Sequence, residues 1–272
     1  MFDLSGKIIV ITGGAGLLGQ QHVEAIAEYN GIPVILDLSE DKIQTVVSRI
    51  KEQYNVKTVG LTADITSEEQ ISTCCQKVLK DFGKVDVLIN NAANNPKVED
   101  NGKGLIFSRL ENFDLELWNQ DLAVGLTGSF LCAKYFGHAI ARNTNGGAII
   151  NISSDLGVIA PDQRLYSKEG VSEELRDVKP VTYSVVKTGL IGLTRYLATY
   201  WADKNVRCNA ICPGGVFNHQ DESFVQKVSQ LIPLGRMANK DEYKGVIVFL
   251  ASDASSYMNG AIVSVDGGRS VW

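Results

Sequence analysis

The sequence contains no apolar run of membrane-spanning length and no dense cluster of lysine and arginine. Its 272 residues include 26 basic and 31 acidic side chains, which gives a net charge of −5 at pH 7. Proteins that bind nucleic acids or membrane surfaces electrostatically carry basic patches, so we expect neither partner. The first residues lack the basic and apolar segments of a signal peptide, and we expect a cytoplasmic protein.

Cysteine is scarce, and a linker rich in proline and serine is missing. The five cysteines are an odd number, at positions 74, 75, 132, 208 and 212. Their spacings match neither a zinc site nor a disulfide framework, so we expect reduced thiols and no metal site. The hydrophobic content of 44% is enough for one large core. We therefore interpret residues 1–272 as a single domain.

Strand-like and helix-like patterns alternate along the chain. Several strand-like runs are continuous β-branched or aliphatic stretches, which is typical of strands covered on both faces. Strands are expected at residues 7–11, 33–37, 57–61, 85–90, 147–152, 205–211 and 261–265. Helices are expected at residues 17–29, 40–54, 67–82, 114–142, 181–203 and 240–252. This alternation predicts an α/β fold with a doubly wound, seven-stranded parallel sheet of Rossmann-like type and helices on both faces.

A glycine-rich turn follows the first expected strand. Gly13, Gly16 and Gly19 come after residues 7–11, and Leu17 and Leu18 open the apolar face of the next helix. Glycines let the backbone turn tightly and approach a ligand, and the helix N-terminus directs unpaired N–H groups at phosphates. The turn predicts a dinucleotide site. The alternative is a turn that only tightens the junction between strand and helix.

An acidic residue, Asp37, ends the second expected strand. It lies about twenty residues beyond the glycine turn, where a carboxylate can accept hydrogen bonds from both hydroxyls of an adenosine ribose. It would also repel a 2′-phosphate, and no lysine or arginine stands beside it, so NAD is expected rather than NADP. The alternative is that Asp37 caps the following helix.

Further short motifs occur in a consistent order. They are Asp64-Ile65, Asn90-Asn91-Ala92-Ala93, Asn151-Ile152-Ser153-Ser154, Tyr183-Ser184-Val185-Val186-Lys187, Asn209-Ala210-Ile211-Cys212-Pro213-Gly214-Gly215 and Asp266-Gly267-Gly268. In this order and spacing, the chain resembles the single-domain branch of the short-chain dehydrogenase/reductase family over nearly its whole length. The resemblance implies a nicotinamide-dependent oxidoreductase that acts on a small molecule.

The resemblance implies a catalytic set of Ser154, Tyr183 and Lys187. Tyr183 would donate or accept the proton, Lys187 would lower its pKa and bind the nicotinamide ribose, and Ser154 would hold the substrate oxygen, with Ser153 as the second candidate. Positions i and i+4 share a helix face. A free phenol titrates near pH 10, so a base that works near neutrality needs its pKa lowered by roughly 3 units. The alternative is an exposed Tyr–Lys pair and an ordinary serine turn.

The same resemblance implies a set of cofactor-binding residues. Besides Tyr183 and Lys187, the set contains Gly13, Gly16, Leu17, Leu18, Asp37, Asp64, Ile65, Asn91, Ala92, Pro213, Gly214 and Val216. A second Tyr-x-x-x-Lys motif occurs at residues 200–204, and we expect it on the wrong side of the sheet for a ligand at the strand carboxyl ends.

Three features depart from the family pattern. The glycines are spaced Gly-x-x-Gly-x-x-Gly, as in the extended branch that includes nucleotide-sugar epimerases and dehydratases. Gly125 occupies the place of a catalytic asparagine. Residues 155–180 form an insertion, which we expect over the substrate side together with an aperiodic loop at 217–234. The alternative for the insertion and for the polar stretch 94–112 is solvated decoration.

We expect an NAD-dependent oxidoreductase that moves a hydride between nicotinamide and an alcohol or carbonyl carbon. The mixed charges of the insertion favour a polar, sugar-type substrate, and the chain also resembles oxidoreductases of bacterial flagellin and surface-glycan modification. The alternatives are a catalytically impaired dinucleotide-binding protein, and an epimerase or dehydratase that uses NAD transiently. Apolar residues on several faces of 114–142 and 181–203 favour a homodimer or homotetramer over simple packing onto the sheet.

Overall fold

The computed structural model describes residues 1–94, 108–167 and 170–272, and it contains one parallel sheet. Its strands are β1 Ile8–Thr12, β2 Ile32–Asp37, β3 Val59–Thr62, β4 Val87–Asn90, β5 Gly147–Ile152, β6 Val206–Pro213 and β7 Ile262–Val265. They lie in the order β3-β2-β1-β4-β5-β6-β7, and every neighbouring pair is parallel. The predicted Rossmann-like architecture is confirmed.

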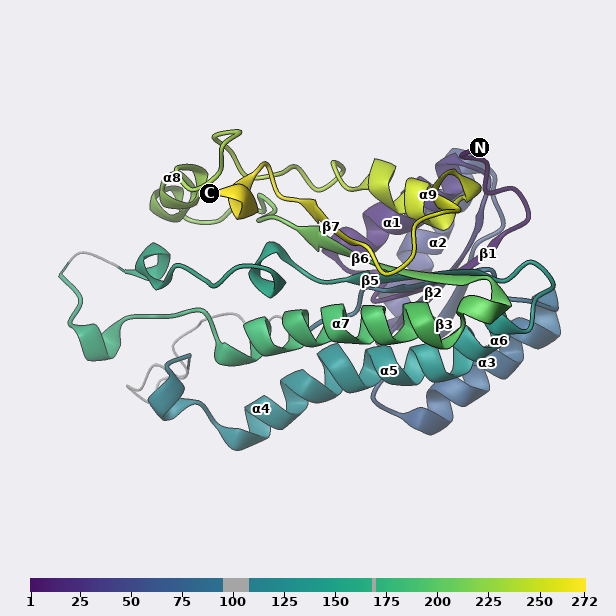
Figure 1. Cartoon of the computed structure of the whole chain (residues 1–272), viewed down its shortest axis with the longest axis horizontal. Coiled ribbons are helices and arrows are strands. Elements are labelled where there is room, and N and C mark those ends of the chain that lie inside the picture. The colour runs from purple at the N-terminus through teal and green to yellow at the C-terminus, as the bar shows by residue number, and fades with distance from the viewer. Residues whose placement is uncertain (95–107, 168–169) are drawn as a thin grey trace.

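Helices cover both faces of the sheet (Figure 1). One face carries α1 Leu17–Glu28, α2 Glu40–Tyr54 and α9 Lys244–Ala251. The other carries α3 Glu68–Phe82, a long helix that runs through α4 Leu115–Leu122, α5 Gly128–Cys132 and α6 His138–Ala141, and α7 Val181–Tyr200. Because the crossovers wind in both directions from β1 and β4, the strand carboxyl ends open a crevice there.

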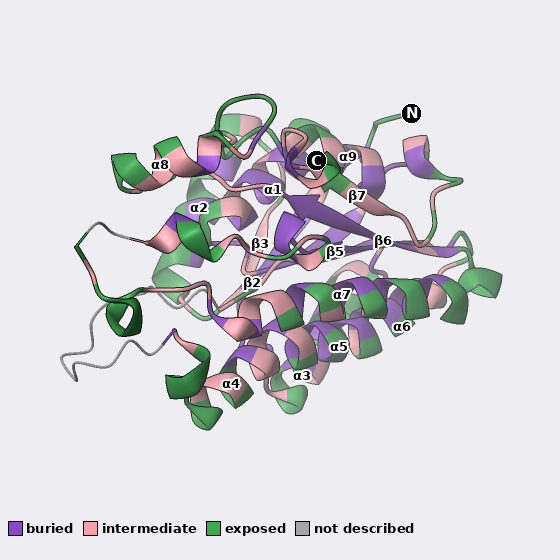
Figure 2. Ribbon diagram, turned by 60° about the vertical axis from the view of Figure 1, so that its left-hand side comes forward, coloured by how far each residue is buried: buried purple, intermediate pink, exposed green. Residues whose placement is uncertain are grey.

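The sheet separates two hydrophobic clusters, and the strands supply residues to both. Figure 2 shows buried strands between the helices. Alternate residues of a strand point to opposite faces, so Val10 packs with the α3 and α7 side while Ile9 and Ile11 pack with the α1 and α9 side. Because helices cover both faces of the sheet, the side chains on both faces of each strand are apolar, and the strands appear in the sequence as continuous aliphatic runs. All five cysteines are buried free thiols within this framework.

The long helix is not α-helical throughout. Two π-helical turns, Ala123–Thr127 and Ala133–Gly137, interrupt it. Such turns are rare and frequently occur at functional sites. The first contains Gly125, at the position where the family pattern has an asparagine.

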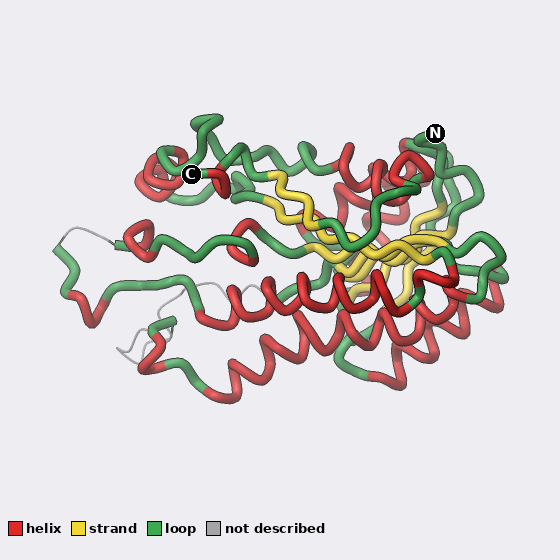
Figure 3. Tube along the Cα trace, viewed as in Figure 1, coloured by secondary structure: helices red, strands yellow, loops and turns green. Residues whose placement is uncertain are grey.

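The segment 217–234 is not the aperiodic loop that we predicted, because it contains α8 Glu222–Ser229 (Figure 3). The carboxylate of Asp221 caps this helix by accepting hydrogen bonds from the backbone N–H groups of Ser223 and Phe224. With only eight residues, α8 is too short to produce a convincing helical period. Its inner face packs on the insertion, where Val228 and Leu165 share a small hydrophobic cluster.

The insertion 155–180, as far as it is described, runs out beyond the sheet in short 3-10 turns (Figure 1). Tyr166 of this insertion and Phe224 of α8 lie with their ring centroids 5.7 Å apart. The two segments expected over the substrate side therefore contact each other. Most of the polar stretch 94–112, from residue 95 to 107, lies outside the described residues.

Candidate active site

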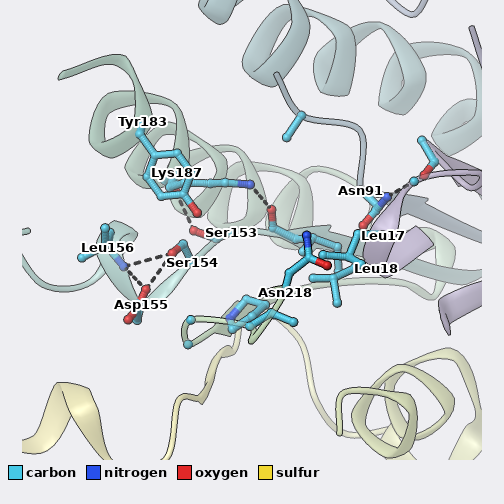
Figure 4. A pocket seen from close by; sticks show the side chains of 18 of the residues that line it. Leu17, Leu18, Asn91, Ser153, Ser154, Asp155, Leu156, Tyr183, Lys187 and Asn218 are labelled. Atoms are coloured by element: carbon cyan, nitrogen blue, oxygen red, sulfur yellow. Dashed lines mark hydrogen bonds between the residues drawn. The ribbon is translucent and has the colours of Figure 1, made fainter. Parts of the chain in front are cut away.

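A cavity of about 640 Å³ opens at the carboxyl ends of the strands. Figure 4 shows Tyr183, Lys187 and Ser154 together in this pocket, along with Leu17, Leu18 and Asn91. Every residue predicted for the site lines the cavity, namely Gly13, Gly16, Leu17, Leu18, Asp37, Asp64, Ile65, Asn91, Ala92, Ser154, Tyr183, Lys187, Pro213, Gly214 and Val216. The carboxyl ends of six strands, β1 to β6, and the starts of two helices, α1 and α7, therefore contribute to one cavity.

The glycine turn at one end of the cavity has the shape that a pyrophosphate needs. Gly13 has φ of +61°, and a Cβ there would lie 2.9 Å from the Cα of Ala92. The amide of Asn91 holds the turn by donating to the carbonyl oxygens of Thr12 and Gly13, at 2.9 and 3.1 Å. No side chain caps the N-terminus of α1 at Gly16, so its backbone N–H groups are available to an anion.

Asp37 lies at the same end of the cavity. Its carboxylate accepts hydrogen bonds from the backbone N–H groups of Ala15, at 3.0 Å, and Leu38, at 2.8 Å. It does not cap α2, because the N-cap residue of that helix is Ser39. The cationic residues that line the cavity, Lys179, Lys187 and Arg269, are all at the opposite end, with Tyr183. The glycine turn, the uncapped start of α1 and the Asp37 carboxylate are therefore groups of the kinds that hold a dinucleotide.

The first turns of α7 bring the proposed catalytic residues to the other end. Lys187 is buried, and its ammonium donates to the backbone carbonyl of Ile152 at 2.8 Å. Ser153 donates its hydroxyl to the backbone carbonyl of Lys187 at 2.7 Å, so it ties β5 to α7. Ser154 lies beside Tyr183 and acts to lower the pKa of its phenol, whereas the hydroxyl of Ser153 is engaged with the carbonyl of Lys187.

The pKa values at this end follow from burial. Burial raises the pKa of Tyr183, and the hydrogen bond with Ser154 opposes this only in part. Burial, with a smaller contribution from Lys179, lowers the pKa of Lys187 to about 8. The protein alone therefore does not lower the pKa of the phenol, and a further positive charge in the cavity is needed to do so.

A buried ion pair supports Ser154, and sequence reasoning missed it. The guanidinium of Arg269 contacts the carboxylate of Asp155 at 2.9 Å, with the two side chains only 7% and 4% exposed. Asp155 also accepts the hydroxyl hydrogen of Ser154 at 2.7 Å. The two charged residues are 114 positions apart, so no local pattern could have revealed the pair. The only indication in the sequence was that a charged residue, Asp155, directly follows the Ser154 motif.

Gly125 lies under Val186, whose Cγ1 atom fills the space that a side chain would need. A small cavity of about 20 Å³ remains beside it, lined by Asn94, Asp121, Tyr183 and Lys187 among others. Asp121 is buried and accepts a hydrogen bond from the amide of Asn94 at 2.8 Å. The cavity is large enough for one water molecule with polar partners.

We expect Gly125→Asn to destabilise the protein rather than to restore a missing catalytic group. The added side chain would overlap Val186, and overpacking of this kind costs about 1–3 kcal/mol. Thermal unfolding measures the loss, and Val186→Ala in the same background should recover part of it. If the Gly125→Asn protein were as stable as the wild type, the helix would have to shift locally to make room for the added side chain.

The second Tyr-x-x-x-Lys motif lies elsewhere, as predicted. Tyr200 is 58% exposed and lines a separate groove between α3, α5 and α7. Within the described residues, His, Cys, Asp and Glu side chains form no group of three that could hold a metal ion. In the same part of the chain, no helix combines the length and apolar character needed to cross a membrane.

The fold and the site define a dinucleotide-binding oxidoreductase. The family described as enoyl-(acyl carrier protein) reductase matches residues 15–270. An NADP-dependent mannitol dehydrogenase of Alternaria alternata is 33% identical over 100% of this chain and 95% of its own. An NAD-dependent glycerol dehydrogenase of Listeria innocua is 30% identical over 99% of this chain and 96% of its own.

Two further similarities extend the comparison. The post-translational flagellin modification protein A of Campylobacter coli is 27% identical over 97% of this chain and 98% of its own. The crystal structure of a short-chain type dehydrogenase/reductase from Mycobacterium marinum is 27% identical, covers 98% of this chain and 96% of its own, and has a TM-score of 0.83. The chain belongs to the short-chain dehydrogenase/reductase family, and it is an NAD(P)-dependent oxidoreductase of alcohols and carbonyls.

Proposed function

We propose that the protein is an NAD-dependent dehydrogenase of a polar, sugar-type substrate, and that Tyr183 is its general acid and base. One observation carries the proposal, namely that Tyr183, Lys187 and Ser154 meet at one end of a single cavity whose other end holds the glycine turn and Asp37. The relatives named for mannitol and glycerol fit a polyol-like substrate.

The position of each residue in the cavity indicates the part of the cofactor that it would bind. The N–H groups that open α1 would hold the pyrophosphate, Asp37 the adenosine ribose, and Lys187 the nicotinamide ribose. Asp64, Ile65, Asn91 and Ala92, with Pro213, Gly214 and Val216, would line the rest of the bound cofactor. NAD supplies the hydride acceptor when it is bound.

The chain's own residues handle the proton. In alcohol oxidation, the deprotonated phenol of Tyr183 accepts the proton of the substrate hydroxyl, and in reduction it returns that proton. Ser154 would hold the same oxygen by turning its hydroxyl hydrogen from Asp155 to the substrate. The positive charges of Lys187 and of oxidised nicotinamide favour the phenolate and counter the effect of burial on its pKa. Since Gly125 offers no side chain, a water in the small cavity between Lys187 and Asp121 is our candidate for carrying protons onward.

The experiment follows absorbance at 340 nm with NAD or NADP and a panel of alditols, aldonates and simple alcohols. We expect turnover with NAD, and a preference for NAD over NADP that Asp37→Asn lowers at least tenfold, because the variant removes the charge that repels a 2′-phosphate. Asp41→Asn, on the exposed first turn of α2, is the matched control.

The panel also separates the alternatives. Tight NAD binding in calorimetry without turnover of any substrate would favour a catalytically impaired binding protein. Product formation without net NADH release would favour an epimerase or dehydratase. An unaltered NAD preference in Asp37→Asn would remove Asp37 from the cofactor assignment.

The cellular setting and assembly belong to the same proposal. We propose a cytoplasmic enzyme of carbohydrate modification, and the flagellin modification relative supports this setting. A groove of about 750 Å³ on the outer face of α3, α5 and α7 exposes Phe130, Tyr196 and Tyr200 by 51%, 60% and 58%. Exposed aromatic side chains gathered in this way support a homodimer or homotetramer built on this face.

A further inference from the structure

Lys179 is a cation at the substrate end of the cavity that the mechanism above does not use. It lies near the end of the insertion, one residue before the N-cap residue of α7, Pro180. Its ammonium lies over the ring of Tyr183, 3.7 Å from the ring centroid, and the side chain lines the main cavity. Lys179 is therefore next to the group that handles the reacting oxygen.

The other charged groups at this end have partners. Asp155 pairs with Arg269 at 2.9 Å, and Asp162 pairs with Arg164 at 2.7 Å. Lys187 is hydrogen-bonded to a backbone carbonyl, as described above. Among the residues that the structure describes, no carboxylate forms an ion pair with Lys179.

Lys179 is half-buried. An ammonium partly withdrawn from water without a counter-ion is costly, and the cost falls when a ligand supplies the opposite charge. Burial lowers the pKa of Lys179 to about 8, even though Asp155 acts in the opposite direction. The insertion and α8 also line the cavity with Leu165, Tyr166 and Phe224, none of which carries a negative charge. An anion in this part of the cavity would complete the site.

We propose that Lys179 binds an anionic group of the substrate, and that this group is a carboxylate. The inference rests on the proposed function and narrows its substrate to a sugar acid, that is, a polyhydroxy carboxylate. Because Tyr183 must reach the reacting oxygen, an anion beside Lys179 belongs to the same small molecule. A single unpaired positive charge matches a carboxylate better than a phosphate, which carries nearly two negative charges.

The test compares aldonates of four to six carbons with the alditols of the same carbon number and configuration, using NAD. Each pair differs only by a carboxylate in place of a hydroxymethyl group. We expect the wild type to favour aldonates in kcat/KM. Lys179→Met should lower the ratio of aldonate to alditol kcat/KM by ten- to hundredfold, mainly through KM, because a charge-assisted hydrogen bond is lost.

Arg164→Gln is the matched control, because Arg164 belongs to the same insertion but has its side chain 87% exposed and paired with Asp162. It should leave the aldonate preference in place. Aldonate protection of the protein–NAD complex against thermal unfolding gives a second readout, which should weaken in Lys179→Met and persist in Arg164→Gln.

The pH dependence gives a third readout. Lys179 is charged below its pKa of about 8, so aldonate KM should rise as pH increases above that value, while alditol KM should not follow it. Tyr183, Lys187 and Tyr166 also face this region, and their titration would affect both substrates. Asp155 and Arg269 face it as an ion pair.

The outcomes separate this inference from the proposed function. Turnover of alditols as efficient as that of aldonates, with a ratio that Lys179→Met does not change, would overturn the inference and leave the dehydrogenase intact. An equal fall in kcat for both substrates would also overturn it, since Lys179 would then act through Tyr183. No turnover of any substrate despite NAD binding would refute the proposed function itself.

Discussion

Tyr183→Phe is expected to lower kcat by roughly 10²–10⁴-fold, the usual contribution of general acid–base catalysis, while NAD still binds. The substitution removes one hydroxyl, the group that lies beside Ser154 and would exchange a proton with the substrate. The aromatic ring under Lys179 remains, so packing and the cation–π contact persist. Steady-state kinetics and calorimetric titration with NAD measure the two effects separately.

Tyr200→Phe is the natural control for this prediction. It belongs to the second Tyr-x-x-x-Lys motif on the same helix, but it lines the outer groove and stacks on Tyr196, with ring centroids 5.5 Å apart. Its removal should leave kcat close to that of the wild type. If Tyr183→Phe retained near-normal turnover, another group would have to supply the proton and the mechanism would fail.

The architecture was predictable because its signals are local and repeated. Each aliphatic run of five or six residues, such as Ile8–Thr12, could be read as a strand covered on both faces. Parallel strands bring their carboxyl ends to one edge, so the glycine turn, Asp37 and the Ser154 motif had to meet there. The fold class and the location of the site could therefore be predicted from the order of the strands and motifs along the chain.

Other features depend on contacts between distant residues, which a single sequence does not encode locally. The space at Gly125 is filled by Val186, 61 positions later, and the partner of Asp155 is Arg269 near the C-terminus. Helix α8 was missed because it has only eight residues and packs its apolar side chains on the distant insertion. The raised pKa of Tyr183 likewise reflects how deeply the fold buries it.

These unpredicted contacts share a location. Asp155 and Lys179 belong to the insertion, and α8 packs on it. Arg269, which lies near the C-terminus, forms its ion pair with Asp155 of the insertion. Figure 1 shows the C-terminus next to α8, and the indole N–H of Trp272 donates to the carbonyl of Leu231 at 3.1 Å. These contacts tie the C-terminal residues to the insertion and to the segment after α8, which supports our proposal that the insertion lines the substrate side.

Arg269→Met is expected to destabilise the protein by about 3–5 kcal/mol, because it leaves the Asp155 carboxylate buried without its counter-ion. The pair is almost completely withdrawn from solvent, at 7% and 4% exposure. For a protein of this size the loss corresponds to a fall in Tm on the order of 10 °C. Thermal and denaturant unfolding of the purified variant measure it directly.

The surface pair between Lys7 and Asp253 gives the control. Its N–O distance is 2.8 Å, close to that of the buried pair, but the side chains are 26% and 83% exposed. Lys7→Met should cost less than about 1 kcal/mol, because exposed ion pairs contribute little. Equal losses in the two variants would mean that burial does not govern the Asp155–Arg269 pair.

A double variant, Asp155→Asn with Arg269→Met, separates the charge effect from lost packing. It leaves no unpaired buried charge, so it should be more stable than Arg269→Met alone. Its kcat should nevertheless stay below that of the wild type, because the Asp155 carboxylate that accepts the hydroxyl hydrogen of Ser154 is replaced by an amide. Recovery of stability without recovery of turnover is the expected signature of a pair that both completes the fold and orients the serine beside Tyr183. If the double variant regained full turnover, the role of Asp155 would be structural alone.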